Sequence, residues 1–302
     1  MSEPSVITDF LNNEEMRKLD TFVLRARSVV ESSRIGMHSS PLKGSSVEFA
    51  DHRQYVKGDN LRHMDWKVFA RTDRYYIKQF EEETSLRVQV VIDGSGSMEY
   101  AGADRMTKYD YACRLAASVA YIVTKQQDSL GLTIYDDQIR SHLPTRSGTR
   151  HLRAFLDRMA ENRPRGRTNT GQALHSLAEM IHRRALIVLL SDLLDDPDAI
   201  FSAIAHFRKK MHDVIVIQIL DPVELELSVD RVAEFIDMET NEKLELDPRA
   251  ARLEYKKALQ SAIDRCRERC VALNVDYRLC STGQTFEEFI HQYLIERLRM
   301  SL

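Results

Sequence analysis

The residues of this sequence that are best suited to chemistry lie in one short loop. The apolar run 88–92 ends in Asp93, and two hydroxyl residues, Ser95 and Ser97, follow at alternate positions. Such a run is typical of a buried parallel strand, and open α/β sheets bind their ligands where these strands end. The intervening glycines let the backbone turn tightly, so the three side chains can converge. Because hard cations prefer oxygen ligands, the loop predicts a site for Mg²⁺ or Mn²⁺, with Ca²⁺ as a further candidate.

An ordinary turn is the alternative, since Asp, Gly and Ser are also common turn residues. The D-x-S-x-S pattern nevertheless resembles the metal-ion-dependent adhesion site of von Willebrand factor A domains, and two further stretches extend the resemblance. The loop 166–171 is similar to the one that supplies the family's threonine ligand, here Thr168. A second apolar strand begins at Leu186 and ends in Asp192. Three loops in the family's order favour a metal site over a simple turn.

The resemblance also implies a role for each candidate ligand. Ser95 and Ser97 would bind the ion directly, Thr168 directly or through a water molecule, and Asp93 and Asp192 mostly through water. Neutral hydroxyls would then dominate the inner shell, and the ion would keep enough charge to attract a further carboxylate. The expected donor of that carboxylate is a Glu or Asp of another protein. Docking of this kind needs no nucleophile, and we expect no enzymatic activity.

Other acidic residues near this edge need a separate interpretation. Many related domains have Gly after the Asp of the third loop, whereas Asp192 is followed here by Leu193. Asp221 ends the apolar strand 213–220 and adds a carboxylate to the same edge. The acidic residues that follow Asp192 are interpreted as helix caps, because a helix dipole favours negative charge at its start. These residues are Asp195, Asp196 and Asp198.

Residues 49–72 interleave charged residues, aromatic residues and the only Trp without a clean period. Together with residues 76–83, this segment resembles the signature of domain-of-unknown-function family fifty-eight. Members of that family are bacterial proteins with a von Willebrand A-like domain, typically encoded beside MoxR-type AAA+ ATPases. The match covers about residues 45–200. It implies that such an ATPase is a partner, with a client protein as a further candidate.

Three interpretations of the segment 49–72 stay open. Its Asp and Arg residues could pair with one another and fix it against the sheet. It could instead form a recognition surface, since Trp, Tyr and Arg supply many interface hot spots. A catalytic base at His52 or His63 is the third interpretation, but no nucleophile is evident nearby. The candidate partner-binding residues are Tyr55, Arg62, Trp66 and Arg71.

A basic loop precedes Thr168 and contains Arg163, Arg165 and Arg167. Such a loop is often simply solvated. Because it lies beside the predicted ion, its three arginines could also clamp carboxylates of a partner.

Composition excludes several classes of protein. The 302 residues are 43% hydrophobic and 29% charged, as in ordinary soluble globular proteins. A formal net charge of -3 gives no electrostatic case for nucleic-acid binding. No apolar run approaches the roughly 20 residues that span a membrane, and the polar start does not resemble a signal peptide, so we expect a cytoplasmic protein. The four cysteines lack zinc-site spacing and are expected to be reduced.

The alternation of apolar strands with helices predicts an α/β fold: a von Willebrand A-like, Rossmann-type, mostly parallel sheet with helices on both faces. The strand 139–143 returns after a turn and gives one antiparallel edge strand. Residues 1–80 are expected to form an N-terminal extension packed on the main domain, residues 81–302. An insertion near 222–247 contains a solvent-facing hairpin.

The sequence therefore favours a metal-dependent protein-interaction module, an adaptor or regulator of a MoxR-type ATPase. A metal-dependent hydrolase of phosphate or ester substrates is one alternative. It lacks a second Asp two residues after Asp93, a phosphate-binding G-x-x-x-x-G-K-[ST] loop and a G-x-S-x-G nucleophile elbow. A structural protein with a vestigial metal site is the other alternative.

Overall fold

The chain forms two compact units, one of residues 37–85 and one, the main domain, of residues 1–36 and 86–302. The computed structural model describes residues 10–20, 48–55, 64, 66–72, 75–81, 86–229, 233–239 and 242–300. The predicted N-terminal extension is thus divided between the units. Residues 13–20 are helical, and Leu11 and Leu19 are fully buried in a core of the main domain.

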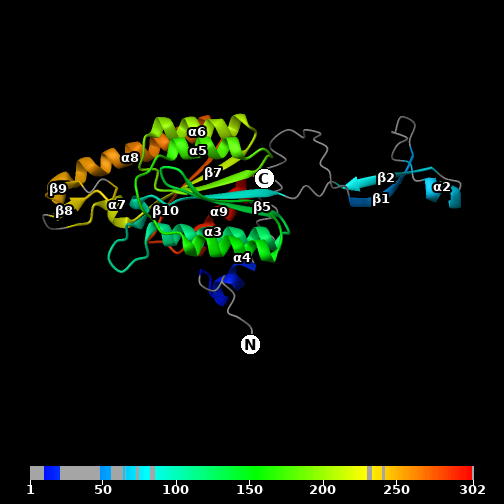
Figure 1. Ribbon diagram of the computed structural model, residues 1–302, viewed down its shortest axis with the longest axis horizontal. Coiled ribbons are helices and arrows are strands. Elements are labelled where there is room, and N and C mark those ends of the chain that lie inside the picture. Colours follow the sequence, from blue (N-terminus) through cyan, green and yellow to red (C-terminus); the bar gives the residue numbers. More distant parts are fainter. Residues whose placement is uncertain are drawn as a thin grey trace. The chain divides into compact units, whose positions relative to one another are not determined.

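A six-stranded sheet forms the centre of the main domain (Figure 1). Its spatial order is β10-β7-β6-β3-β4-β5, and only the edge strand β5 is antiparallel to its neighbour. This is the predicted von Willebrand A-like, Rossmann-type arrangement. The strands are β3 (Arg87–Asp93), β4 (Ser129–Tyr135), β5 (Ile139–Arg146), β6 (Leu186–Ser191), β7 (Asp213–Leu220) and β10 (Asp276–Ser281).

Helices cover both faces of this sheet, as predicted (Figure 1). Each face has its own hydrophobic core because successive side chains of a strand point to opposite sides. In β3, Val90 and Ile92 enter one core and Val91 enters the other. The first core is closed by α3 (Lys108–Lys125), α4 (Thr149–Glu161) and α9 (Phe286–Met300), and the second by α5 (Thr170–Met180), α6 (Pro197–Lys209) and α8 (Pro248–Ala272).

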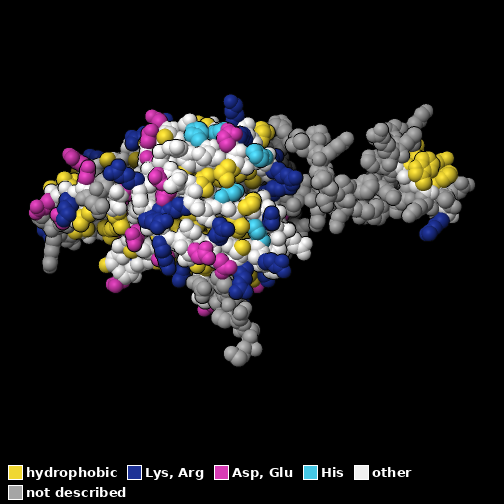
Figure 2. Space-filling view, in the orientation of Figure 1, with side chains coloured by type: hydrophobic (Ala, Val, Ile, Leu, Met, Phe, Trp, Pro, Cys, Tyr) yellow, Lys and Arg dark blue, Asp and Glu magenta, His cyan; other side chains and the backbone are white. Residues whose placement is uncertain are grey.

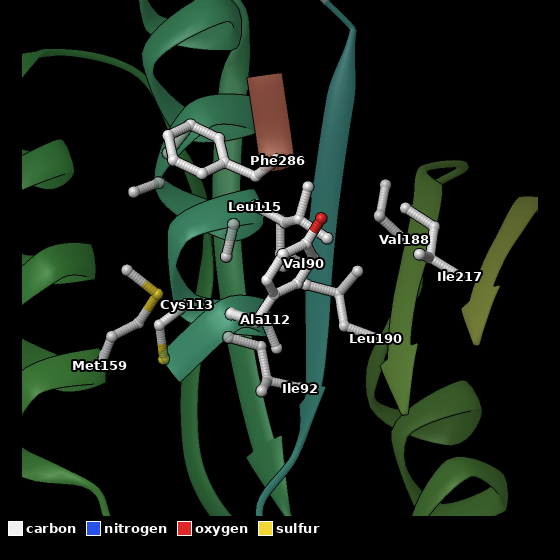
Figure 3. Packing of buried hydrophobic residues seen from close by; sticks show 14 of the residues in the cluster. Val90, Ile92, Ala112, Cys113, Leu115, Met159, Val188, Leu190, Ile217 and Phe286 are labelled. Carbon is white, nitrogen blue, oxygen red and sulfur yellow. The ribbon is translucent and has the colours of Figure 1, made fainter. Parts of the chain in front are cut away.

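Figure 3 shows the first core from close by. Val90 of β3 lies among Leu115 of α3, Val188 of β6 and Phe286 of α9, all of them nearly inaccessible to solvent. Burial of such side chains contributes about 2 kcal/mol each. This packing holds β3 and β6 side by side and fixes the ends of both strands.

The edge at which β3 and β6 end is the topological switch point of the sheet. The chain proceeds from β3 outward to β4 and β5, then returns to β6 on the other side of β3. The pairing of Ile92 with Leu190 brings both strands to the same edge. Ligands of open α/β sheets bind in the crevice at such a point. Asp93 is the last residue of β3, and Asp192 directly follows β6.

Smaller elements surround this edge. A short 3₁₀ helix, η3 (Gly96–Glu99), follows β3, and α7 (Pro222–Glu226) follows β7. The predicted hairpin consists of β8 (Ala233–Ile236) and β9 (Lys243–Leu246), paired antiparallel from Ala233 with Leu246 to Ile236 with Lys243.

The smaller unit contains residues 49–72, the segment whose hydrophobic pattern predicted neither a strand nor a helix. β1 (Glu48–Gln54) and β2 (Tyr76–Glu81) pair antiparallel, and α2 (Trp66–Thr72) lies between them in the chain. The rings of Phe69 and Tyr75 stack with centroids 4.6 Å apart. Aromatic contacts therefore hold α2 against the start of β2.

None of the helices in the described part of the chain combines the length and the apolar character that a membrane crossing requires. All four cysteines are free thiols.

Candidate metal centre

The loop after β3 brings its three predicted ligands together. The Asp93 carboxylate accepts a hydrogen bond from the Ser95 backbone N–H at 3.0 Å. The Oγ atoms of Ser95 and Ser97 lie 3.1 Å apart. Ser95 is fully buried and Ser97 is partly exposed, so the hydroxyl pair lies at the boundary between the sheet and solvent.

Asp93 is a buried carboxylate that is held from several sides. Its Oδ2 accepts hydrogen bonds from the Ser191 hydroxyl at 2.7 Å and from the Tyr135 hydroxyl at 3.2 Å. Burial raises the pKa of Asp93 to about 6, the charge of Asp192 adds to the rise, and the hydrogen bonds from Ser191 and Ser95 oppose it. A cation nearby would favour the ionised form of this carboxylate.

The second loop contacts the first through its backbone. Gly96 N–H donates to the Gly166 carbonyl at 3.0 Å, and Arg165 N–H donates to the Gly94 carbonyl at 3.0 Å. Gly166 has φ +75°, a left-handed conformation that glycine adopts without strain. Thr168, two residues later, shares a hydrogen bond of 3.1 Å with Thr170. The two loops predicted to share an ion are therefore in direct contact.

Asp192, the predicted ligand of the third loop, already has a cationic partner. Lys108 Nζ lies 2.7 Å from Asp192 Oδ2 and 2.7 Å from Glu224 Oε1. The Lys108 side chain is fully buried. Burial lowers the pKa of Lys108, but the two carboxylates raise it more, so the ammonium stays charged.

Sequence reasoning missed Lys108 and Glu224. One signal for Lys108 exists: it lies in the first turn of α3, where the helix dipole disfavours a cation. A lysine at that position needs carboxylates nearby. The sequence does not reveal which carboxylates they are.

Leu193 occupies the position where related domains often have Gly. Its φ is +57°, which costs about 1 kcal/mol or more for a residue with a Cβ. The Leu193 N–H donates to Ser191 Oγ at 2.9 Å, and the side chain is buried against the second core. The loop thus has the left-handed backbone conformation that glycine favours. Burial of the Leu193 side chain offsets the strain of that conformation.

The donor set fits a small divalent ion held mainly by hydroxyls. Neighbouring ligands of an octahedral Mg²⁺ are roughly 3 Å apart, since each lies about 2.1 Å from the ion. The 3.1 Å between the hydroxyls of Ser95 and Ser97 matches this spacing. Within the described residues, no group of three or more His, Cys, Asp or Glu could hold a metal. An ion here would depend on the hydroxyls, as the sequence predicts.

Asp221 lies at the same sheet edge but is fully engaged in structural contacts. It accepts hydrogen bonds from the Val223 and Gly102 backbones and from the Thr282 hydroxyl, and it pairs with Arg105 at 3.0 Å. Burial would raise the pKa of Asp221, yet these donors together lower it. Asp221 is therefore a cap of α7 and not a free ligand.

Of the three acidic residues predicted as helix caps after Asp192, two accept backbone hydrogen bonds at helix starts, and Asp198 lies within the first turn of α6. Asp196 caps α6 and accepts from the Asp198 N–H. Asp195 accepts from the Thr170 N–H at 2.8 Å and thus supports the start of α5 instead. The interpretation as caps is confirmed for these two residues, although Asp195 serves a different helix from the one expected.

The candidate partner-binding residues lie in both units. Arg163, Arg165 and Arg167 are exposed, and Arg140 donates hydrogen bonds to the carbonyls of Arg163 and Arg165 and so supports the loop from below. Acidic and basic side chains are interspersed over the face of the main domain in Figure 2.

In the smaller unit, Trp66 is 61% exposed and Arg71 is exposed, whereas Tyr55 is half-buried and contacts Tyr75 edge to face. Arg62 lies outside the described residues. Of this group, Trp66 is the large apolar side chain that solvent reaches most.

The β8–β9 hairpin faces solvent, as predicted, and Asp237 and Met238 at its tip are exposed. Its tip also makes two contacts that were not predicted. The Thr168 N–H donates to Glu239 Oε2 at 2.9 Å. The carbonyl O of Met238 lies so close to Gly96 that a Cβ there would be 2.8 Å away. A hairpin's own sequence does not determine the surface on which its turn rests.

A family model described as "Protein of unknown function DUF58" matches residues 51–264. The chain is also similar to "Uncharacterized protein Rv1480" of Mycobacterium tuberculosis and "Uncharacterized protein Mb1516" of Mycobacterium bovis. Each is 28% identical over 230 residues, which cover 74% of this chain and 71% of the relative.

Among solved structures, BatB from Bacteroides thetaiotaomicron aligns with a TM-score of 0.46 and 13% identity, over 71% of this chain and 100% of that one. The SpRpn10 VWA domain aligns with a TM-score of 0.38 and 14% identity, over 69% of this chain and 95% of that one.

Proposed function

Because the chain belongs to the DUF58 family, we propose that its von Willebrand A-like domain is a metal-dependent docking module for another protein. The pair of hydroxyls of Ser95 and Ser97, 3.1 Å apart at the switch point of the sheet, is the observation that supports this most. A divalent ion bound there would supply a Lewis-acidic position for a partner's carboxylate.

The residues around this position would have different roles in holding the ion. Ser95, Ser97 and Thr168 would offer neutral oxygens to Mg²⁺ or Mn²⁺. Asp93, held by Ser95, Ser191 and Tyr135, would orient water in the ion's shell. Asp192 would do the same while its charge is balanced by Lys108. Because few formal negative charges face the ion, it would attract a carboxylate of a partner.

We propose a MoxR-type AAA+ ATPase in the cytoplasm as the partner, with the chain acting as its adaptor or regulator. The resemblance to a family typically encoded beside such ATPases supports this choice. The exposed arginines Arg163, Arg165 and Arg167 belong to the loop whose backbone contacts Gly94 and Gly96. Their positive charge would steer an acidic partner surface toward the ion and make association sensitive to salt.

A hydrolytic function has less support. Among the described residues, the hydroxyls of Ser95 and Thr168 have another hydroxyl as their hydrogen-bond partner, and no imidazole contacts them. A nucleophilic hydroxyl needs an adjacent base, and the carboxylates beside Ser95 and Ser97, those of Asp93 and Glu239, would here face the ion. We therefore expect no hydrolysis of generic phosphate or ester substrates at this site.

A pull-down of the neighbouring ATPase tests the proposed function. Wild-type protein should bind it with Mg²⁺ and lose it with chelator, and Ser95→Ala combined with Ser97→Ala should abolish the metal-dependent part. The matched control replaces Ser176 and Ser202, exposed hydroxyl residues of α5 and α6, by Ala. Equal binding by all variants in both buffers would refute metal-dependent docking.

A further inference from the structure

A turn at the tip of the β8–β9 hairpin presents one carboxylate to the candidate metal centre. The Asp237 N–H donates to the Glu242 carbonyl at 2.9 Å and closes the turn. The Glu239 N–H donates to Asp237 Oδ1 at 2.8 Å and fixes the local backbone. These bonds hold Glu239 at the apex, away from the paired strands.

The apex rests on both loops that would hold the ion. The hydrogen bond from the Thr168 N–H to Glu239 Oε2 joins it to the second loop. Contact of the Met238 carbonyl with Gly96 joins it to the first loop, and the space there is too small for a Cβ. The hairpin is therefore docked on the candidate metal centre at two points, although residues 233–239 are more than 60 positions away from Thr168 in the sequence.

Among the described residues, none donates a hydrogen bond to the second carboxylate oxygen of Glu239, the buried Oε1. The nearby Ser97 hydroxyl favours the ionised form and lowers the pKa of this carboxyl. Burial raises the pKa of Glu239, and the charges of Asp192 and Asp237 raise it further. A buried carboxylate oxygen without a hydrogen-bond partner destabilises the docked arrangement. This destabilisation would be removed by a cation placed among Glu239, Ser97 and Thr168.

We propose that Glu239 is an internal ligand of the ion, which fills the coordination position that a partner's carboxylate takes on docking. This inference rests on the proposed function. The hairpin then acts as a competitor built into the chain, and a partner binds by displacing Glu239.

Displacing the hairpin tip from the metal centre should cost little free energy. Its strands have four residues each, and an isolated two-stranded hairpin is marginally stable in water. Ile236, Met238 and Leu244 are 51%, 41% and 60% exposed. Hydrophobic side chains are visible at the end of the main domain that carries β8 and β9 (Figure 2). Undocking the tip therefore uncovers little apolar surface that is now buried.

The test is Mn²⁺ binding to the full chain, measured by calorimetry and by water-proton relaxation. Replacing Glu239 by Gln or Ala should weaken Mn²⁺ binding about tenfold or more. The relaxivity of the bound ion should rise, because water replaces the lost ligand. Glu245→Gln, the same charge change at an exposed position of β9, should alter neither quantity.

Partner binding is a second measurement, in which Glu239→Ala should increase affinity instead of lowering it. At saturating Mn²⁺, Glu239→Ala should bind the ATPase several-fold more tightly than wild-type protein, because no internal carboxylate competes. Glu245→Gln should again match wild type.

The outcomes separate the two proposals. If wild-type protein binds Mn²⁺ and the double variant of Ser95 and Ser97 does not, the metal site stands. Unchanged affinity and relaxivity in Glu239→Ala would then overturn the internal ligand alone. If wild-type protein binds no Mn²⁺, the metal site and the internal ligand are both wrong.

Discussion

At the scale of residues, Asp93 determines how the site should respond to pH. Its pKa of about 6, against an ordinary value of 3.8, means that the folded, metal-free protein binds a proton more tightly than the unfolded chain. Stability of the metal-free protein should therefore fall as pH rises from about 4 to about 6, by up to about 3 kcal/mol. A bound divalent ion favours the carboxylate and should cancel this loss.

The increase in melting temperature produced by Mg²⁺ should thus be larger at pH 7.5 than at pH 5. Thermal unfolding of dialysed protein with and without Mg²⁺ measures it. Asp93→Asn, which cannot ionise at this position, should remove both the pH dependence and the response to Mg²⁺. An equal Mg²⁺ effect at the two pH values would show that Asp93 does not face the ion.

The sequence predicts residues of this site where the pattern is local. Asp93, Ser95 and Ser97 span five residues at the end of one strand, and the structure places them together. Lys108 and Glu239 could not be predicted, because each reaches the site from another element. Their contacts depend on tertiary packing, which no periodicity reports.

At the scale of elements, α3 contributes a buried charge as well as an apolar face. Lys108 balances Asp192 and Glu224, so its removal leaves two carboxylates unpaired in a buried position. We expect Lys108→Met to lower the free energy of unfolding by about 3–5 kcal/mol. Urea unfolding measures this difference.

Lys125, at the other end of α3, is the matched control. Its side chain is 50% exposed and lies 3.4 Å from Asp20. Lys125→Met should leave stability close to that of wild-type protein, because exposed ion pairs contribute little. Similar losses in both variants would mean that α3 tolerates no lysine replacement, and that the pairing of Lys108 is not the cause.

Strands were easier to predict than helix starts. The run 213–220 is β7 as predicted, because a fully buried parallel strand is continuously apolar. Helix α3 begins at Lys108, where the Thr107 hydroxyl accepts a hydrogen bond from the Asp110 N–H. That Thr-x-x-Asp cap is readable in the sequence. The hairpin was also predicted, but its docking on the site was not.

At the scale of the whole molecule, the signature segment and the metal centre belong to different compact units. Trp66 is 61% exposed in the smaller unit, and the candidate ligands all lie in the main domain. Trp66→Ala should therefore leave Mn²⁺ affinity unchanged, within about twofold, by calorimetry. If the segment is a recognition surface, the same variant should weaken capture of the ATPase. A loss of Mn²⁺ affinity would show that Trp66 contributes to the metal centre.

The α/β class, the antiparallel edge strand and helices on both faces could all be predicted, because alternating strands and helices permit few arrangements. The division at residues 36 and 85 could not. Contacts within residues 37–85 define that unit, and its mixed charged and aromatic sequence has no period from which those contacts follow.

The central claim is that a divalent ion binds at the carboxyl ends of β3 and β6. Anomalous scattering from crystals soaked in Mn²⁺ tests it most directly. We predict one strong peak within about 2.1–2.3 Å of the hydroxyl oxygens of Ser95 and Ser97, next to Thr168 and Glu239. Strong density elsewhere on the chain and none at these hydroxyls would contradict the account.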